Sequence, residues 1–255
     1  LTVNDDDGSF ARAVMEIRIS NVKPVLKTIV TPHFFEDIDA VIRMEAGDTL
    51  SDQDLLQFHL DLGDGRVITG GEKIRVVYSK SGYYEIKGWV TDDDNESSDV
   101  RISPIVVDNI IPYGTISSSH TSLNEDEVIQ LELVDIYDTP TDLKNLTIIW
   151  DLDDGSPTRE GEKINHTYTK RGTYNVEAII SDGDASTSET VRIRVNNPSP
   201  TAVLGVSKET VLQGENVAFS ASKSYDNPSD NDTLVYYWDF DDGTTGEGTS
   251  ITHNY

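Results

Sequence analysis

The chain has no cysteine among its 255 residues, so no disulfide can stabilise it. Small extracellular domains of vertebrates commonly depend on disulfides. The sequence therefore fits a prokaryotic surface protein better, and apolar cores alone must hold its domains together.

Basic residues are scarce, and long apolar runs are missing. Twenty Lys and Arg face 46 Asp and Glu, which gives a formal net charge of -26. Nucleic-acid binding is excluded as the main role, because the dominant attraction there comes from cationic side chains. No apolar run is long enough to span a bilayer, and the sequence does not begin with a signal peptide. Residue 1 is leucine rather than an initiator methionine, so we expect the natural amino terminus to lie elsewhere.

Catalytic motifs are also missing. Neither Gly-x-Ser-x-Gly nor His-Glu-x-x-His occurs. His166 and His253 occupy the same repeat position, but Val76 replaces them in another copy. A metal ligand or general base would not be exchangeable for valine, so these histidines are interpreted as packing residues. The sequence predicts that the chain is not an enzyme.

A repeated motif dominates what is present. LDLGDG at 60–65 recurs as WDLDDG at 150–155 and WDFDDG at 238–243, so the spacings are 90 and 88 residues. YSKSGYY at 78–84 recurs as YTKRGTY at 168–174, and Tyr255 begins a third copy. A fixed period of about 88 residues indicates a tandem array of units that are each large enough to bury a core.

Proline-containing connectors mark the expected boundaries. NVKP at 21–24 is followed by NIIP at 109–112 and NPSP at 197–200, so an Asn-x-x-Pro pattern recurs at intervals of 88 residues. Proline restricts its own backbone and that of its predecessor, so these connectors should be short and stiff. The predicted units are 1–22 (the last strands of a truncated repeat), 23–108, 109–196 and 197–255 (the first part of a truncated repeat).

Short alternating segments predict an all-β fold. Ile129, Leu131 and Leu133 alternate with polar residues, and so do Ala13, Met15, Ile17 and Ile19. Such a period of two is typical of half-buried strands. About seven short strands per 88 residues, with turn residues between them, indicate tandem immunoglobulin-like β-sandwiches.

These motifs closely resemble those of the polycystic kidney disease (PKD) domain. The resemblance rests on Trp-Asp-x-x-Asp-Gly followed by His-x-Tyr-x3-Gly-x-Tyr-x-Val, and repeat 109–196 carries it most fully. It implies an immunoglobulin-like sandwich that is common in archaeal and bacterial surface proteins and in accessory modules of secreted enzymes. It does not imply catalysis. Repeat 23–108 departs from it, with Leu60 in place of the tryptophan and Val76 in place of the histidine, and we expect this copy to be the least stable.

The motif residues are expected to have structural roles. The tryptophans should lie in the cores, and the aspartates should accept backbone hydrogen bonds around a tight turn. The residues assigned to this class are Trp150, Trp238, Asp151, Asp239, Gly155, Gly243, Tyr168, Gly172 and Tyr174.

Acidic turns and glycosylation sequons are the remaining candidate sites. Calcium binds six to eight oxygens, and closely spaced carboxylates supply several of them. The candidate calcium ligands lie one strand before each connector, although an ordinary solvated turn is the competing interpretation: Asp5, Asp7, Asp92, Asp94, Asp182 and Asp184. The Asn-x-Ser/Thr sequons, which are compatible with glycans on an extracellular chain, are Asn95, Asn145, Asn165 and Asn231.

Two functions remain open. The first is a stiff extracellular stalk, sheath or filament whose partners are neighbouring repeats or further copies of the chain. The second is an adhesin or carbohydrate-binding accessory region that contacts surface glycans. Because Leu1 corresponds to Ala178 and Tyr255 to Tyr168, we expect these residues to be a window onto a longer periodic chain. The competing expectation is an open last repeat that accepts residues 13–19 of another copy.

Overall fold

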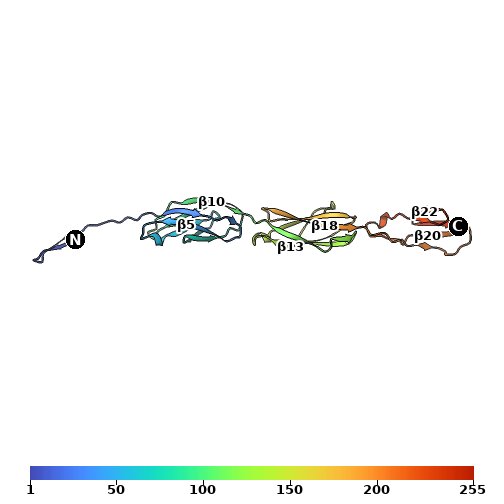
Figure 1. Cartoon of the computed structure of the whole chain (residues 1–255), viewed down its shortest axis with the longest axis horizontal. Helices are drawn as coiled ribbons and strands as arrows, with labels where there is room; N and C mark the ends of the chain where they lie inside the picture. Colours follow the sequence, from blue (N-terminus) through green and yellow to red (C-terminus); the bar gives the residue numbers. More distant parts are fainter. The chain divides into compact units, whose positions relative to one another are not determined.

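The computed structural model describes residues 1–255 and contains β-strands and three short 3-10 helices but no α-helix. The prediction of an all-β fold is confirmed. The chain folds as two parts, Leu1–Ile110 and Ile111–Tyr255. Figure 1 labels the strands of both. None of the helices has the length and apolar character that crossing a bilayer requires.

The first part begins with a small hairpin, β1 (Thr2–Asn4) and β2 (Phe10–Arg12). Residues 13–24 form no strand, and residues 13–20 are all exposed. The prediction of a strand through Ala13, Met15, Ile17 and Ile19 is therefore wrong. An alternating pattern shows which side chains a sheet would bury, but it does not supply the neighbouring strand to which the backbone must bond.

Repeat 23–108 is a sandwich of a three-stranded and a five-stranded sheet. The sheet orders are β3-β5-β8 and β4-β10-β9-β6-β7, antiparallel except for the short parallel pair β4–β10. The elements are β3 (Val25–Val30), β4 (Phe34–Phe35), β5 (Ala40–Gly47), η1 (Gln53–Leu55), β6 (Gln57–Asp61), β7 (Val67–Gly70), β8 (Lys73–Val76), β9 (Gly82–Thr91) and β10 (Arg101–Asp108).

Repeat 109–196, in the second part, has the same arrangement. Its sheet orders are β11-β13-β16 and β12-β18-β17-β14-β15. The elements are β11 (Tyr113–Ser118), β12 (Ser122–Asn124), β13 (Val128–Tyr137), η2 (Asp142–Lys144), β14 (Thr147–Asp151), β15 (Arg159–Glu160), β16 (Lys163–Thr167), β17 (Gly172–Ser181) and β18 (Ser186–Asn196).

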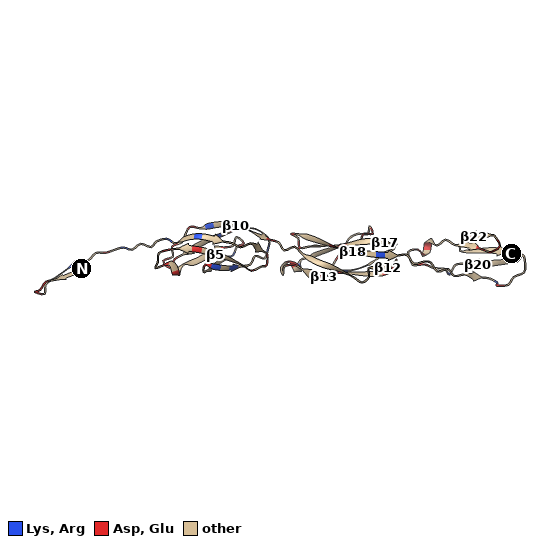
Figure 2. Ribbon diagram, viewed as in Figure 1, with Lys and Arg blue, Asp and Glu red and all other residues tan.

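Residues 197–255 form smaller sheets, β19-β20-β23 and β21-β22. Their elements are β19 (Gly205–Val206), β20 (Asn216–Ser220), η3 (Asn231–Thr233), β21 (Tyr237–Asp239), β22 (Thr245–Glu247) and β23 (Ser250–Asn254). Figure 2 marks acidic residues at the turn of the β1–β2 hairpin and at η3. Asp and Glu thus occupy turns rather than the centres of strands at these places.

Each complete repeat has its own core between its two sheets. In repeat 109–196, Ile129 and Leu131 of β13 face Trp150 of β14 and Val176 of β17, and all four are 0% exposed. In repeat 23–108, Leu60 takes the place of the tryptophan and is also 0% exposed, while Phe58 on the same strand adds a buried ring. The ring that is missing at one position of β6 is thus supplied two residues earlier.

Candidate functional site

The repeated Asp-Gly motif forms a tight turn that its own aspartates stabilise. Asp151 Oδ1 accepts a hydrogen bond from the Asp153 amide at 3.0 Å, and Asp239 accepts the same bond from Asp241. Asp153 has φ 60, a left-handed conformation that aspartate tolerates. Gly155 and Gly243 have φ of 77 and 89, which favours glycine. In this geometry, a backbone amide of the turn binds Oδ1 of Asp151 and of Asp239.

The tyrosines of the second motif close the same end of each sandwich. The Tyr168 hydroxyl donates to the carbonyl of Leu152 at 3.0 Å, and the Tyr78 hydroxyl donates to that of Leu62 at the same distance. Burial raises the pKa of Tyr168 well above its ordinary value. Tyr174 stacks on Tyr168, and its hydroxyl donates to the Lys170 carbonyl just before Gly172. Both tyrosines therefore fix the turn that precedes β17.

The histidines of the motif each bind the last aspartate of the turn. His166 Nε2 lies 2.8 Å from Asp154 Oδ2, and His253 Nε2 lies 2.8 Å from Asp242 Oδ2. In repeat 23–108, where valine replaces histidine, Arg66 binds the corresponding Asp64 through Nε at 2.8 Å. A basic side chain thus meets this carboxylate in all three copies.

The tryptophans combine packing with one hydrogen bond. Trp150 is fully buried, and its indole N–H donates to the Gly161 carbonyl at 2.8 Å. Trp238 makes the same bond to Gly248 at 2.7 Å, but it is only partly buried between the smaller sheets of residues 197–255.

The first aspartate of each acidic turn stabilises its own turn. Asp5 Oδ1 accepts from the amides of Asp7 and Ser9, and Asp182 Oδ1 accepts from those of Asp184 and Ala185. In the third of these turns, Asp92 Oδ1 accepts from Glu96 and Oδ2 accepts from Asn21 in the connector, whereas Asp94 is exposed. Nowhere do three or more His, Cys, Asp or Glu side chains gather as a metal site. Calcium at these turns stays a prediction, and Asn, backbone or water oxygens would have to complete its shell.

A buried carboxylate that the sequence analysis missed lies at the same end of each complete sandwich. Asp138 is 4% exposed and Oδ1 accepts from the Thr139 amide, but Oδ2 is buried without a hydrogen-bond partner. Oδ2 of Asp48, which holds the same place in repeat 23–108, has the same property. Burial, reinforced by the nearby carboxylates of Asp182 and Asp142, raises the pKa of Asp138. An oxygen left unpaired among carboxylates fits a cation ligand.

A second missed site joins residues about a hundred positions apart within Ile111–Tyr255. Asp126 Oδ2 accepts from the Ser229 amide at 2.8 Å, from its hydroxyl at 2.8 Å and from Asn227 Nδ2 at 3.0 Å. Asp126 is held in a left-handed conformation, and its amide donates to the Tyr168 carbonyl. Hydrogen bonds from Ser229 and Asn227 lower the pKa of Asp126. We call this contact the Asp126 joint.

The neighbouring Glu125 extends the joint. Glu125 is 6% exposed, and its side chain accepts a hydrogen bond from the Arg171 amide. Burial raises the pKa of this carboxyl, and the nearby Asp230 carboxylate adds to the effect. No sequence signal within repeat 109–196 identifies Asn227, Ser229 and Asp230 as partners, because they belong to the next repeat.

The sequons lie where an enzyme could reach them. Asn95 is in the acidic turn after β9, and Asn145 directly follows η2. Asn165 is on β16, an edge strand, and Asn231 opens η3. All four residues are exposed. Their glycosylation stays a prediction.

Comparison with known proteins assigns the family. The PKD domain family matches residues 21–107, 115–196 and 197–255. The PKD1 domain of the Vibrio cholerae metalloprotease PrtV is 22% identical over 34% of this chain and 100% of its own, with a TM-score of 0.28. The PKD1 domain of Vibrio anguillarum Epp is 20% identical over 35% and 100%, with a TM-score of 0.28. Bacteroides ovatus SGBP-B, in complex with a mixed-linkage heptasaccharide, is 14% identical over 92% and 70%, with a TM-score of 0.29. The three family matches span most of the 255 residues, and the chain belongs to the PKD domain family.

Proposed function

We propose that this chain is part of a stiff, non-enzymatic stalk, sheath or filament of tandem PKD domains at the surface of a prokaryotic, archaeal cell. PKD domains are generally non-catalytic modules, which supports a non-enzymatic role. Its partners would be neighbouring repeats or further copies of the chain. A net charge of -26 and the exposed sequons suit an extracellular location.

The Asp126 joint is the observation that carries this proposal. Three hydrogen bonds to one ionised carboxylate tie the loop at 227–229 to the end of the preceding sandwich. Charge-assisted bonds of this kind are about twice as strong as neutral ones. Pro228 lies between the two bonding residues and restricts the loop further. A joint built in this way opposes bending between consecutive repeats.

Distance measurements by electron paramagnetic resonance test the joint. The chain has no cysteine, so spin labels at Glu189→Cys and Thr245→Cys report only on repeats 109–196 and 197–255. A narrow distance distribution is expected, and Asp126→Ala should broaden it. The matched control is Glu177→Ala, which removes a carboxylate of the same repeat outside the joint. A broad distribution in the unsubstituted chain would contradict a stiff stalk.

We propose in addition that calcium binds at the end of the sandwich that contains Asp138 and Asp182. Hard cations prefer carboxylate and carbonyl oxygens, and the unpaired, buried Oδ2 of Asp138 offers one. The turn residue Asp182 contributes negative charge there. The corresponding pair in repeat 23–108 is Asp48 and Asp92, of which Asp92 bonds to the connector residue Asn21.

The alternative function, an adhesin or a carbohydrate-binding accessory region, has weaker support. Tyr113 and Tyr137 are a pair of neighbouring aromatic rings at the surface, 54% and 51% exposed. However, their rings stack on each other at 5.4 Å rather than forming a flat row for a sugar. Binding of surface glycans would be shown by oligosaccharide titrations that perturb these two tyrosines.

A further inference from the structure

Repeat 23–108 exposes a row of apolar side chains on the outer face of its five-stranded sheet. Ile102 and Val106 of β10 are 58% and 41% exposed, and Val100, directly before this strand, is 54% exposed. Pro104 lies between Ile102 and Val106 and is exposed as well, whereas Ile105, which alternates with them, is buried in the core. The strand β10, labelled in Figure 1, thus presents a continuous apolar row to solvent.

The corresponding strand of repeat 109–196 carries polar and basic side chains at these positions. The four matching residues, from the strand register of the two sheets, are Ser188, Thr190, Arg192 and Arg194. The apolar row is therefore not required by the fold of a repeat. Contiguous exposed apolar surface commonly marks an interaction site.

The neighbouring strand β9 adds an aromatic ring at each end of this face and one charge of each sign between them. Tyr83 is 85% exposed, and Trp89 is partly buried and stacks on His59. Glu85 and Lys87 lie between the two rings and are paired with each other at 3.8 Å. We call the outward side chains of β9 and β10, from 83 to 89 and from 100 to 106, the β10 face.

The order of these side chains is self-complementary about Ile86. A two-fold axis that crosses β9 at this residue, between two facing sheets, sets position 85 opposite position 87 of a second copy and position 83 opposite position 89. Each Glu85 then meets a Lys87, and each Tyr83 meets a Trp89. On β10, position 104 lies beside 85 and position 102 beside 87, so proline meets isoleucine in the same way. Every charge of the face thus meets an opposite charge.

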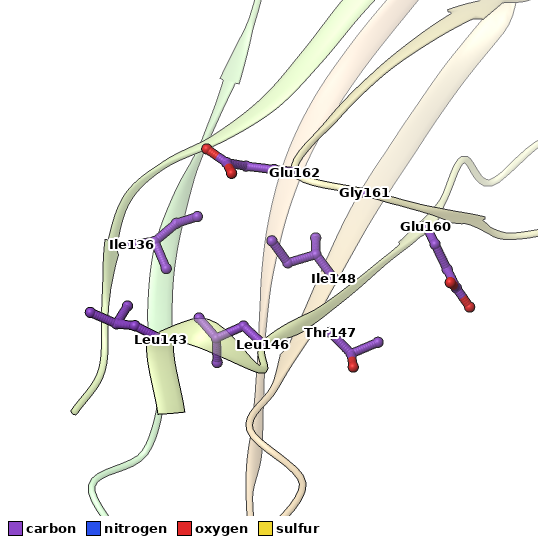
Figure 3. A pocket seen from close by; sticks show the side chains of 8 residues that line it. All are labelled: Ile136, Leu143, Leu146, Thr147, Ile148, Glu160, Gly161 and Glu162. Atoms are coloured by element: carbon purple, nitrogen blue, oxygen red, sulfur yellow. The ribbon is translucent and has the colours of Figure 1, made fainter. Parts of the chain in front are cut away.

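Charge also favours a second copy over other occupants. The chain has a net charge of -26, so most surfaces of two copies repel each other, whereas the β10 face carries one positive and one negative charge. A strongly cationic or anionic partner finds no matching net charge there. By contrast, both charged residues that line the open pocket of repeat 109–196 are glutamates, Glu160 and Glu162 (Figure 3), so two copies of that surface would repel each other.

We propose that the β10 face is an isologous contact through which two copies of the chain pair. The strands β9 and β10 of one copy lie antiparallel over those of the other, and the apolar side chains leave water. The inference rests on the proposed function, because it names the surface through which further copies of the stalk associate laterally. A contact of this small size is weak on its own.

Sedimentation equilibrium of the full 255-residue chain, together with methyl spectra at increasing concentration, tests the pairing. Dimers should form as the concentration rises to about 1 mM, and the methyl signals of Val100, Ile102 and Val106 should shift in proportion to the dimer fraction. Ile102→Arg should weaken pairing at least about tenfold, because it places a charge against apolar groups at two symmetric positions. The matched control Thr190→Arg introduces the same side chain at the corresponding position of the other complete repeat and should leave pairing unchanged.

Exchange of the two charges tests the symmetry of the contact. Lys87→Glu brings like charges together at two symmetric positions, and it should weaken pairing about two- to tenfold at low ionic strength. Glu85→Lys should have the same effect. The double variant Glu85→Lys/Lys87→Glu should restore pairing, and an equimolar mixture of the two single variants should form a heterodimer. High salt should reduce these differences.

The proposal is overturned if the chain stays monomeric at about 1 mM or if Ile102→Arg pairs as well as the unsubstituted chain. It is also overturned if Thr190→Arg weakens pairing equally, if the charge exchange fails to restore it, or if an oligosaccharide rather than a second copy shifts the methyl signals. A monomeric chain with a narrow spin-label distance distribution would remove the lateral contact and keep the stiff stalk. A chain that pairs but has a broad distribution would do the reverse.

Discussion

The last aspartate of the motif, which is Asp64, Asp154 or Asp242, is paired with a basic side chain in all three copies. The type of that basic side chain differs between the copies. In repeats 109–196 and 197–255 the aspartate binds a histidine, and in repeat 23–108 it binds Arg66. Burial tends to raise the pKa of Asp154, but hydrogen bonds from Ser156 and His166 outweigh it and lower this pKa. Such a carboxylate stabilises the fold above its unfolded pKa of about 3.9, and the contribution is lost as the pH falls through the folded pKa.

His166→Val should therefore destabilise repeat 109–196 and shift its acid unfolding to higher pH. Asp154 would lose one partner, which we expect to cost about 1–3 kcal/mol. The double variant His166→Val/Ser156→Arg copies the Val76 and Arg66 pair and should recover most of that loss. Hydrogen exchange of β17 between pH 3 and pH 7 measures both effects. If the single variant is as acid-resistant as the unsubstituted chain, the His166–Asp154 pair does not stabilise the repeat.

Trp150→Ala should be the most damaging single change in its repeat. The indole is 0% exposed and satisfies the Gly161 carbonyl. Truncating a buried tryptophan costs about 3–5 kcal/mol. Hydrogen exchange in the full chain should show this loss in β13 and β17 but leave β9 of the other complete repeat unchanged. A loss below about 1 kcal/mol in β17 would mean that the indole adds little to the core.

At the scale of elements, local patterns predict a strand only where a sheet is available to receive it. Ile129, Leu131 and Leu133 alternate in the sequence, and all are buried on β13. The alternating residues 13–19 have an equally regular pattern but remain exposed and unpaired. The Asp-Gly turns could be predicted because glycine and aspartate determine the backbone locally. Pairing with a distant strand is not encoded in any single segment.

The candidate sites likewise could be predicted only where the residues of one segment determine the geometry. Closely spaced aspartates were enough to predict the acidic turns. The sequence did not show that the first aspartate of a turn, such as Asp182, accepts hydrogen bonds from the backbone amides of that turn. Asp138 was missed because a single aspartate after a strand looks like an ordinary loop residue. Only packing shows that its Oδ2 is buried and unpaired.

At the scale of the whole molecule, the proposed stalk function depends on the connections between repeats. The proline connectors indicate short links from the sequence alone, but the Asp126 joint joins residues 101 and 103 positions apart. In the first part, the connector residue Asn21 bonds to Asp92 at 2.7 Å. One acidic group of repeat 23–108 thus contacts the connector that precedes it, and one of repeat 109–196 contacts the repeat that follows it. Under the stalk proposal, the stiffness of the chain would therefore depend on the ionisation and the ligands of a few carboxylates.

Calcium should accordingly stiffen the chain without creating its fold, because the cores of the two complete repeats are closed without it. Binding to the folded state alone adds about 2.7 kcal/mol at a hundredfold excess of free calcium over Kd. Isothermal titration should therefore show binding, and hydrogen exchange should slow at the turn at 182–184 and in the loop at 138–142. Asp138→Asn should remove most of this effect in repeat 109–196. Asp94→Asn, at an exposed residue of the other complete repeat, should leave that response unchanged. Absence of binding heat at millimolar calcium, together with unaltered exchange after addition of a chelator, would exclude calcium from these sites, and the proposed stiffness would then have to come from the hydrogen-bonded contacts alone.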